Sequence, residues 1–315
     1  MTVRLVFVHG IGGPRDADTE LDQWTKALAA GAREGGHERF ADEVLPALDR
    51  RFVYYGDLFH GTGKQGADDE LPDEENLRAL LDNVISNLLE NEQDADTEEK
   101  LRRALLRLQP KGQAQGGGAV AGPAINATTT LMTIQPLQKG AQWLSGRKLL
   151  GSLGQVGRYL SPKSKAVDGS ALAPAAQDRI LDALGDTSIV IAHSLGSVVA
   201  YEALHRTEKH VPMFLTLGSP LALRTFVKQR VAPRPLRTPE CVRQWLNFWD
   251  KDDIVAARPI PARSTAPNSA GVGLKGKRIQ SDGVWTHTAT KYLRDARVAG
   301  QIAQTVDRHG ESPQR

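Results

Sequence analysis

The feature that most constrains this chain is a serine placed between a buried strand and a buried helix. Residues 187–191 form an apolar run suited to a parallel sheet covered on both faces, and residues 197–205 have the composition of a buried helix. Between them stands a small-x-Ser-x-Gly pattern centred on Ser194, with Ala192 and Gly196 at its ends. So sharp a turn from strand to helix brings the two close together and requires small end residues. The pattern predicts a serine that projects from a strand's carboxyl end, where a base can reach it.

Strand and helix patterns alternate on both sides of this serine, which predicts an α/β protein. Apolar runs of strand length are separated by stretches with helical periodicity. Connections of this type join parallel neighbours by right-handed crossovers, so we expect a mostly parallel central sheet flanked by helices. The predicted strands are 3–8, 51–55, 187–191, 213–217 and 241–249, and the predicted helices are 19–34, 178–184, 197–205 and 289–306.

We expect residues 1–315 to form a single domain, interrupted by a largely helical insertion at 61–170. Apolar residues between 77 and 89 follow helical spacing, and three glycines at 116–118 indicate a flexible joint. An insertion at this place would project over the carboxyl ends of the strands, where it can act as a lid. A Pro/Gly/Ser-rich loop is predicted at 257–276, and the tail at 309–315 is predicted to be disordered.

Charge divides the insertion into two halves. From Asp68 to Glu99 there are thirteen acidic residues and one basic residue, whereas 100–167 holds eleven basic residues and no acidic one. The halves either neutralise each other or form solvated faces. Alternatively, the basic stretch 100–167 contacts an anionic membrane surface.

Composition excludes several other classes. The net charge of +3 does not favour nucleic-acid binding, and no apolar run approaches the roughly 20 residues that span a bilayer. One cysteine, Cys241, forms no internal disulfide, and without a signal sequence we expect a cytoplasmic protein. The stretch Gly10-Ile11-Gly12-Gly13 lacks the third glycine of a dinucleotide site, and no metal-ligand spacing occurs. The sequence therefore predicts neither a metal nor a cofactor.

At the serine pattern the chain resembles the α/β-hydrolase superfamily, especially its lipases and esterases, in which Ala-His-Ser-Leu-Gly is a familiar nucleophile elbow. The resemblance covers residues 1–60 and about 170–308, and the first motif position is alanine where the common pattern has glycine. It implies the α/β-hydrolase fold, with Ser194 as nucleophile and an acid and a histidine following in chain order. His287, just before the last predicted helix, is then the expected base.

The segment after the strand at 241–249 offers three candidates for the acid of the implied triad, and Asp252 is set aside because it is expected to face solvent. Asp253-Ile254-Val255 resembles the Asp-x-Val turn of similar lipases, so Asp253 is favoured, and Asp250 is the alternative. The carboxylate would hold the imidazole in one tautomer and stabilise its charged form.

The resemblance also implies an oxyanion hole made by two backbone N–H groups. One belongs to Leu195, which follows the nucleophile, and the other to Ile11 in the loop after the first strand. His193 is expected to point away from the reactive side and to pack in the core. The residues predicted to support these loops are His9, Gly10, Gly12 and Gly196.

The expected function is that of a serine esterase. The Ser-His-Asp triad would cleave a carboxylic ester, with a lipid acyl ester as first choice, through an acyl-enzyme intermediate. A thioester or an amide is an alternative substrate for the same triad. A non-catalytic binding module that keeps the hydrolase scaffold is the alternative from another class.

Overall fold

The α/β class and the parallel sheet predicted from the sequence are confirmed. In the computed structural model, six strands form one sheet in the order β2-β1-β3-β4-β5-β6, and every neighbouring pair is parallel. The strands are β1 Arg4–Val8, β2 Asp49–Val53, β3 Thr187–His193, β4 His210–Leu217, β5 Trp245–Asp250 and β6 Leu274–Ile279. The structure describes residues 3–10, 15–59, 94–108, 154–223, 227, 230–251, 253, 256, 259–260, 262–280 and 287–310, and single positions between 78 and 89.

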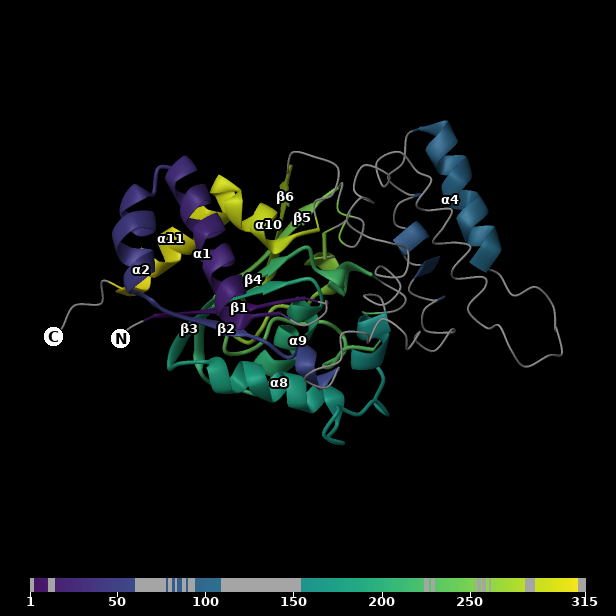
Figure 1. Cartoon of the computed structure of the whole chain (residues 1–315), viewed down its shortest axis with the longest axis horizontal. Helices are drawn as coiled ribbons and strands as arrows, with labels where there is room; N and C mark the ends of the chain where they lie inside the picture. Colours follow the sequence, from purple (N-terminus) through teal and green to yellow (C-terminus); the bar gives the residue numbers. More distant parts are fainter. Residues whose placement is uncertain are drawn as a thin grey trace.

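Helices cover both faces of this sheet (Figure 1). Alternation along β1 explains the two layers, because Leu5 and Phe7 enter the apolar cluster under one set of helices, and Val6 and Val8 enter the other. The first set is α1 Ala17–Glu34, α10 Ala289–Arg294 and α11 Ala296–Gly310, and the second is α8 Leu172–Ala183 and α9 Leu195–Leu204. Shorter elements are a π-helical turn at Phe40–Val44, α2 at Leu45–Ala47 and 3₁₀ turns at Gly56–Leu58, Pro220–Ala222 and Ala262–Ser264.

The sheet is wound in two directions from its middle. The chain passes from β1 to β2 on one side, then returns to the other side of β1 and continues outward from β3 to β6. The chain therefore runs away in opposite directions on the two sides of the boundary between β1 and β3. In open parallel sheets, ligands bind outside the carboxyl ends of the strands at such a switch point.

Several predicted element boundaries differ from those of the structure. The single helix predicted at 289–306 is broken at Asp295, whose side chain accepts a hydrogen bond from the backbone N–H of Arg297 (2.9 Å) and caps α11. Because α11 continues to Gly310, the predicted disorder of the tail is wrong for residues 309 and 310, and 311–315 lie outside the described residues. The loop predicted at 257–276 ends earlier, since β6 begins at Leu274.

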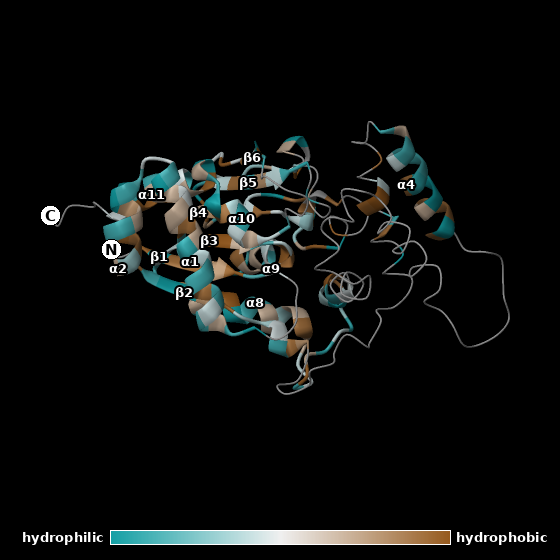
Figure 2. Ribbon diagram, turned by 45° about the horizontal axis from the view of Figure 1, so that its top comes forward, coloured by the Kyte–Doolittle hydropathy of each residue, from teal (hydrophilic) through white to brown (hydrophobic). Residues whose placement is uncertain are grey.

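The described part of the insertion contains α4, Ala95–Leu108, which lies beyond the carboxyl ends of the strands (Figures 1 and 2). Its buried side chains, Leu101, Ala104 and Leu108, join the same apolar cluster as α8 and α9. Residues 154–159 are helical, whereas 161–170 form turns, and the glycines at 116–118 lie outside the described residues. Helical structure is thus present in part of the predicted insertion.

Opposite charges within α4 neutralise each other. Lys100, Arg102 and Arg103 each form an ion pair with the acidic residue four positions earlier, Asp96, Glu98 and Glu99 respectively. No described helix combines the length and apolar character that crossing a membrane requires.

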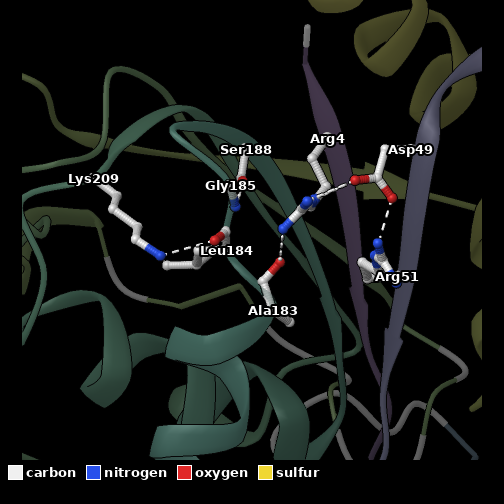
Figure 3. Close-up of polar contacts among 8 residues, drawn as sticks. All are labelled: Arg4, Asp49, Arg51, Ala183, Leu184, Gly185, Ser188 and Lys209. Atoms are coloured by element: carbon white, nitrogen blue, oxygen red, sulfur yellow. Dashed lines mark hydrogen bonds and ion pairs between the residues drawn. The ribbon is translucent and has the colours of Figure 1, made fainter.

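Polar contacts fasten the amino-terminal edge of the sheet (Figure 3). At the end of α8, the carbonyl of Ala183 accepts a hydrogen bond from Arg4 (2.9 Å), and that of Leu184 accepts one from Lys209 (2.8 Å). Arg4 also bonds to Asp49 on the neighbouring strand (2.7 Å). Cations at a helix C-terminus satisfy unpaired carbonyls and oppose the helix dipole, so these contacts stabilise the fold.

Candidate active site

Ser194 lies on a strained turn between β3 and α9. Its backbone has φ 52° and ψ −131°, and among the described residues it is the only one other than glycine with positive φ. Its N–H donates to the carbonyl of Leu217 (3.0 Å), so the hydrogen bonding between β3 and β4 continues up to the turn. Such a backbone costs about 1–3 kcal/mol and persists only where its surroundings impose it.

Two glycines allow the backbone to approach this turn. A Cβ atom on Gly196 would lie 2.1 Å from the carbonyl oxygen of His9, and one on Gly10 would lie 2.5 Å from the Cβ of Ser194. Neither distance is sterically possible, so the loop after β1 and the turn after β3 pack together only because both positions are glycine. Ala192 is completely buried beside Val8 of β1.

The structure brings Ser194, His287 and Asp253 together from three separate parts of the chain. His287 Nε2 lies 2.8 Å from Ser194 Oγ, and His287 Nδ1 lies 2.8 Å from Asp253 Oδ2. The side chain of His287 is 8 % exposed and that of Asp253 is inaccessible. Of the two candidate acids, Asp253 is therefore the one in contact with the imidazole. Asp250 ends β5, and its carbonyl accepts the N–H of Asp253 (3.2 Å), which shapes the turn.

Among the described residues, three donors surround the buried Asp253 carboxylate. In addition to His287, the hydroxyl of Tyr292 donates to Oδ2 (2.7 Å) and the N–H of Ala256 donates to Oδ1 (3.1 Å). Burial, and next the charge of Asp253, raise the pKa of the Tyr292 hydroxyl well above its ordinary value, so the hydroxyl keeps its proton. The buried charge is thus hydrogen-bonded, as such a group requires. Sequence analysis missed Tyr292, which follows His287 by five residues.

Gly218, directly after β4, makes room for the histidine–aspartate pair. It has φ +56°, and an added Cβ would lie 2.9 Å from Asp253 Oδ2 and 3.2 Å from His287 Nδ1. Only glycine meets both the conformational and the steric demand. Sequence analysis did not identify this glycine, which directly follows the strand predicted at 213–217.

A pair of serine hydroxyls holds the base of the turn. Ser197 Oγ donates to the carbonyl of Ser194 (2.6 Å) and lies 2.6 Å from Ser219 Oγ. Ser219 Oγ also accepts the N–H of Leu221 (3.3 Å). These bonds tie the start of α9 to the loop after β4, so the nucleophile turn and the Gly218 loop form one unit.

The prediction that His193 points away from the reactive side is wrong. Its ring centroid lies 4.7 Å from that of His287. Strand alternation gives the reason: Ile189, Ile191 and His193 share one face of β3, and this face also packs against α10, which follows His287. Burial, and next the charge of His287, hold the pKa of His193 well below its ordinary value, so the ring is neutral.

His9 supports the loop after β1 through hydrogen bonds to Tyr55. His9 Nε2 accepts the N–H of Tyr55 (3.2 Å), and the Tyr55 hydroxyl donates to the carbonyl of His9 (2.7 Å). The two rings are stacked, with centroids 4.3 Å apart. Burial, assisted by the charge of Arg15, lowers the pKa of His9 to about 3, so it remains neutral at physiological pH. His9 therefore has the structural role expected for it.

Of the two predicted oxyanion donors, Leu195 lies within the described residues. Leu195 is the first residue of α9, so its N–H has no acceptor within the helix and lies beside Ser194. Ile11 and Gly12 lie outside the described residues. The carboxyl edge at the switch point thus holds a serine, a base, a buried acid and one backbone donor, which together can activate a hydroxyl nucleophile.

Comparisons with protein-family models, curated protein sequences and solved structures found no match to this chain. Within the described part of the chain, no three His, Cys, Asp or Glu side chains are grouped as metal ligands. The functional argument therefore depends on the geometry of the site and on its place in the fold.

Proposed function

We propose that this protein is a serine hydrolase of the α/β-hydrolase superfamily that cleaves a carboxylic ester through an acyl-enzyme. The observation that carries the proposal is the continuous hydrogen-bonded chain from Ser194 Oγ through His287 to Asp253, with both distances at 2.8 Å. This nucleophile, base and orienting acid have the relation that general-base activation of serine requires.

In the proposed reaction, Ser194 Oγ attacks the ester carbonyl and its proton passes to His287 Nε2. Asp253 accepts the Nδ1–H bond, which fixes the tautomer of His287 and stabilises the imidazolium without taking its proton. The tetrahedral intermediate then expels the alcohol, which takes the proton from His287. Water hydrolyses the acyl-enzyme by the same steps, and the N–H groups of Leu195 and Ile11 would bind the oxyanion.

Topology supports the assignment to this superfamily. The nucleophile follows β3, the acid follows β5 and the histidine precedes α10, which gives the superfamily's chain order of serine, acid and histidine. Ser194 also lies at the switch point between β1 and β3, where ligands of open parallel sheets bind.

As the substrate class we propose an acyl ester, and a lipid acyl ester first. The location of α4 beyond the carboxyl ends of the strands suits a cover over the acyl group (Figure 1). Thioesters and amides remain alternatives because the triad does not select the leaving group. The alternative from another class is a binding module that has kept the scaffold, but such a module has no need for an aligned triad.

The test is hydrolysis of p-nitrophenyl esters of graded chain length by the wild type and by Ser194→Ala. We expect measurable turnover by the wild type and a loss of at least about 10³-fold in the variant, with its thermal unfolding retained. Ser188→Ala, on the same strand but at the amino-terminal edge, is the matched control and should leave the rate unchanged. Equal rates in Ser194→Ala and the wild type would refute the proposal.

A further inference from the structure

We infer that Tyr292 is a positioning residue that sets how strongly Asp253 holds His287, an inference that rests on the proposed function. Tyr292 and His287 donate to the same carboxylate oxygen, Asp253 Oδ2, at 2.7 and 2.8 Å. The other oxygen accepts the N–H of Ala256. The tyrosine hydroxyl therefore shares with the imidazole the negative charge on a single atom.

The fold fixes Tyr292 in this position. Ala289, Tyr292 and Leu293 form the buried face of α10, with the spacing of one helical side. On the outer side α10 packs closely against α1, because a Cβ on Gly31 would lie 2.6 Å from the carbonyl oxygen of Arg294. Since His287 lies one residue before the cap of α10, the same short helix locates both donors to Asp253 Oδ2.

Sharing one oxygen has a chemical consequence. A hydrogen bond from Tyr292 withdraws electron density from Oδ2, so Asp253 stabilises the protonated form of His287 less than it otherwise would. The tyrosine hydrogen bond therefore weakens the stabilisation that Asp253 gives to the imidazolium formed when Ser194 transfers its proton. If Tyr292 had only a structural role, its hydroxyl would be satisfied by the buried acceptor and would not change the properties of His287.

Other titratable groups near this pair keep the same state when Tyr292 is altered. His193 packs against His287 and is held neutral by burial, and His9 is neutral for the same reason. Their contribution to the pH profile is therefore constant. In the part of the chain that the structure describes, the remaining charged groups whose fields reach these residues are Arg15 on the β1 side and Asp250 at the end of β5.

The experiment is the pH profile of kcat/KM for a short-chain p-nitrophenyl ester with the wild type and three variants. Tyr292→Phe should move the acid limb to higher pH and lower the plateau about tenfold, because the imidazolium is stabilised more and the carboxylate is held less rigidly. Replacing Tyr292 with 3-fluorotyrosine, a stronger donor of nearly the same shape, should move the limb to lower pH. Tyr201→Phe is the matched control, since this buried hydroxyl bonds to the carbonyl of Pro233 and should leave the limb in place.

Opposite shifts in the two Tyr292 proteins support the inference. Limbs that coincide with that of the wild type in both proteins overturn it and assign Tyr292 a merely structural role. If the phenylalanine variant does not fold, the direction of the fluorotyrosine shift decides alone. Failure of the proposed function is a separate outcome, because the wild-type protein itself would then show no turnover that depends on Ser194.

Discussion

The two edges of the central sheet use polar residues in different ways. At the amino edge, Arg4 and Lys209 bond to the carbonyls that end α8, on ordinary backbone and in partial contact with solvent (Figure 3). At the carboxyl edge, Ser194 has a strained backbone and Asp253 carries its carboxylate in a site closed to solvent. The first arrangement relieves unpaired carbonyls, whereas the second concentrates features that disfavour folding.

This difference separates stabilising contacts from functional ones. Backbone strain and a buried carboxylate both lower stability unless the surroundings compensate. Here the compensation is local and elaborate: Gly10, Gly196 and Gly218 make room, and Tyr292 and Ala256 satisfy the carboxylate. A chain that needed only stability would have no reason to keep such an edge. We therefore expect substitutions at the carboxyl edge to lower activity most, and substitutions at the amino edge to lower stability but not activity.

The largest expected effect is that of Asp253→Asn on turnover. An amide keeps the shape but cannot stabilise the imidazolium and favours the wrong tautomer, so kcat should fall by about 10³–10⁴-fold. Steady-state hydrolysis of a p-nitrophenyl ester measures it. Asp250→Asn, equally buried but not in contact with His287, is the matched control and should lower the rate by less than about tenfold. A larger loss in the control would reverse the assignment of the acid.

The next largest expected effect is on the free energy of unfolding at acidic pH. His9 has its pKa lowered to about 3 in the folded state, against 6.5 for an ordinary histidine. Above pH 6.5 neither state binds this proton, but between 6.5 and 3 the unfolded chain binds it and the folded protein does not. The free energy of unfolding therefore decreases as the pH is lowered through this range, by up to about 1.4 kcal/mol per pH unit for the one proton.

Urea unfolding at several pH values measures this slope. His9→Gln keeps an acceptor for the N–H of Tyr55 but cannot titrate, so its slope between pH 6 and 4 should be smaller by about one proton than that of the wild type. An unchanged slope would mean that His9 is not the group that loses its proton on folding.

The smallest effect is expected at the amino edge. Lys209→Met removes the hydrogen bonds to the end of α8 and should lower the free energy of unfolding by about 0.5–1 kcal/mol. Ester hydrolysis should be unaffected, because this edge lies at the other end of the strands from Ser194. If the rate fell by more than the lower stability can explain, the distinction between the two edges would be wrong.

Much of the site could be predicted because its signals are local. The bend at Ser194 is encoded within five residues. His287 could be selected from four downstream histidines because it alone lies in the loop before the last predicted helix. The sequence favoured Asp253 over Asp250 through its Asp-x-Val turn, but both follow the same strand and only the fold shows which carboxylate meets the imidazole.

Contacts across the fold could not be predicted in this way. Tyr292 has the spacing of an ordinary core residue on α10, and Gly218 resembles any glycine at a strand end. Their functions depend on where α10 and β4 lie relative to Asp253, which a single sequence does not encode locally. His193 was misjudged because its face of β3 was not matched to the helices that cover it.

The most direct test of the central claim is labelling of the folded protein with a fluorophosphonate, followed by peptide mass spectrometry. A serine activated by His287 should form one adduct, on Ser194, that disappears on prior unfolding and in His287→Ala. Absence of an adduct on Ser194 in the folded protein, or equal labelling after unfolding, would contradict the account.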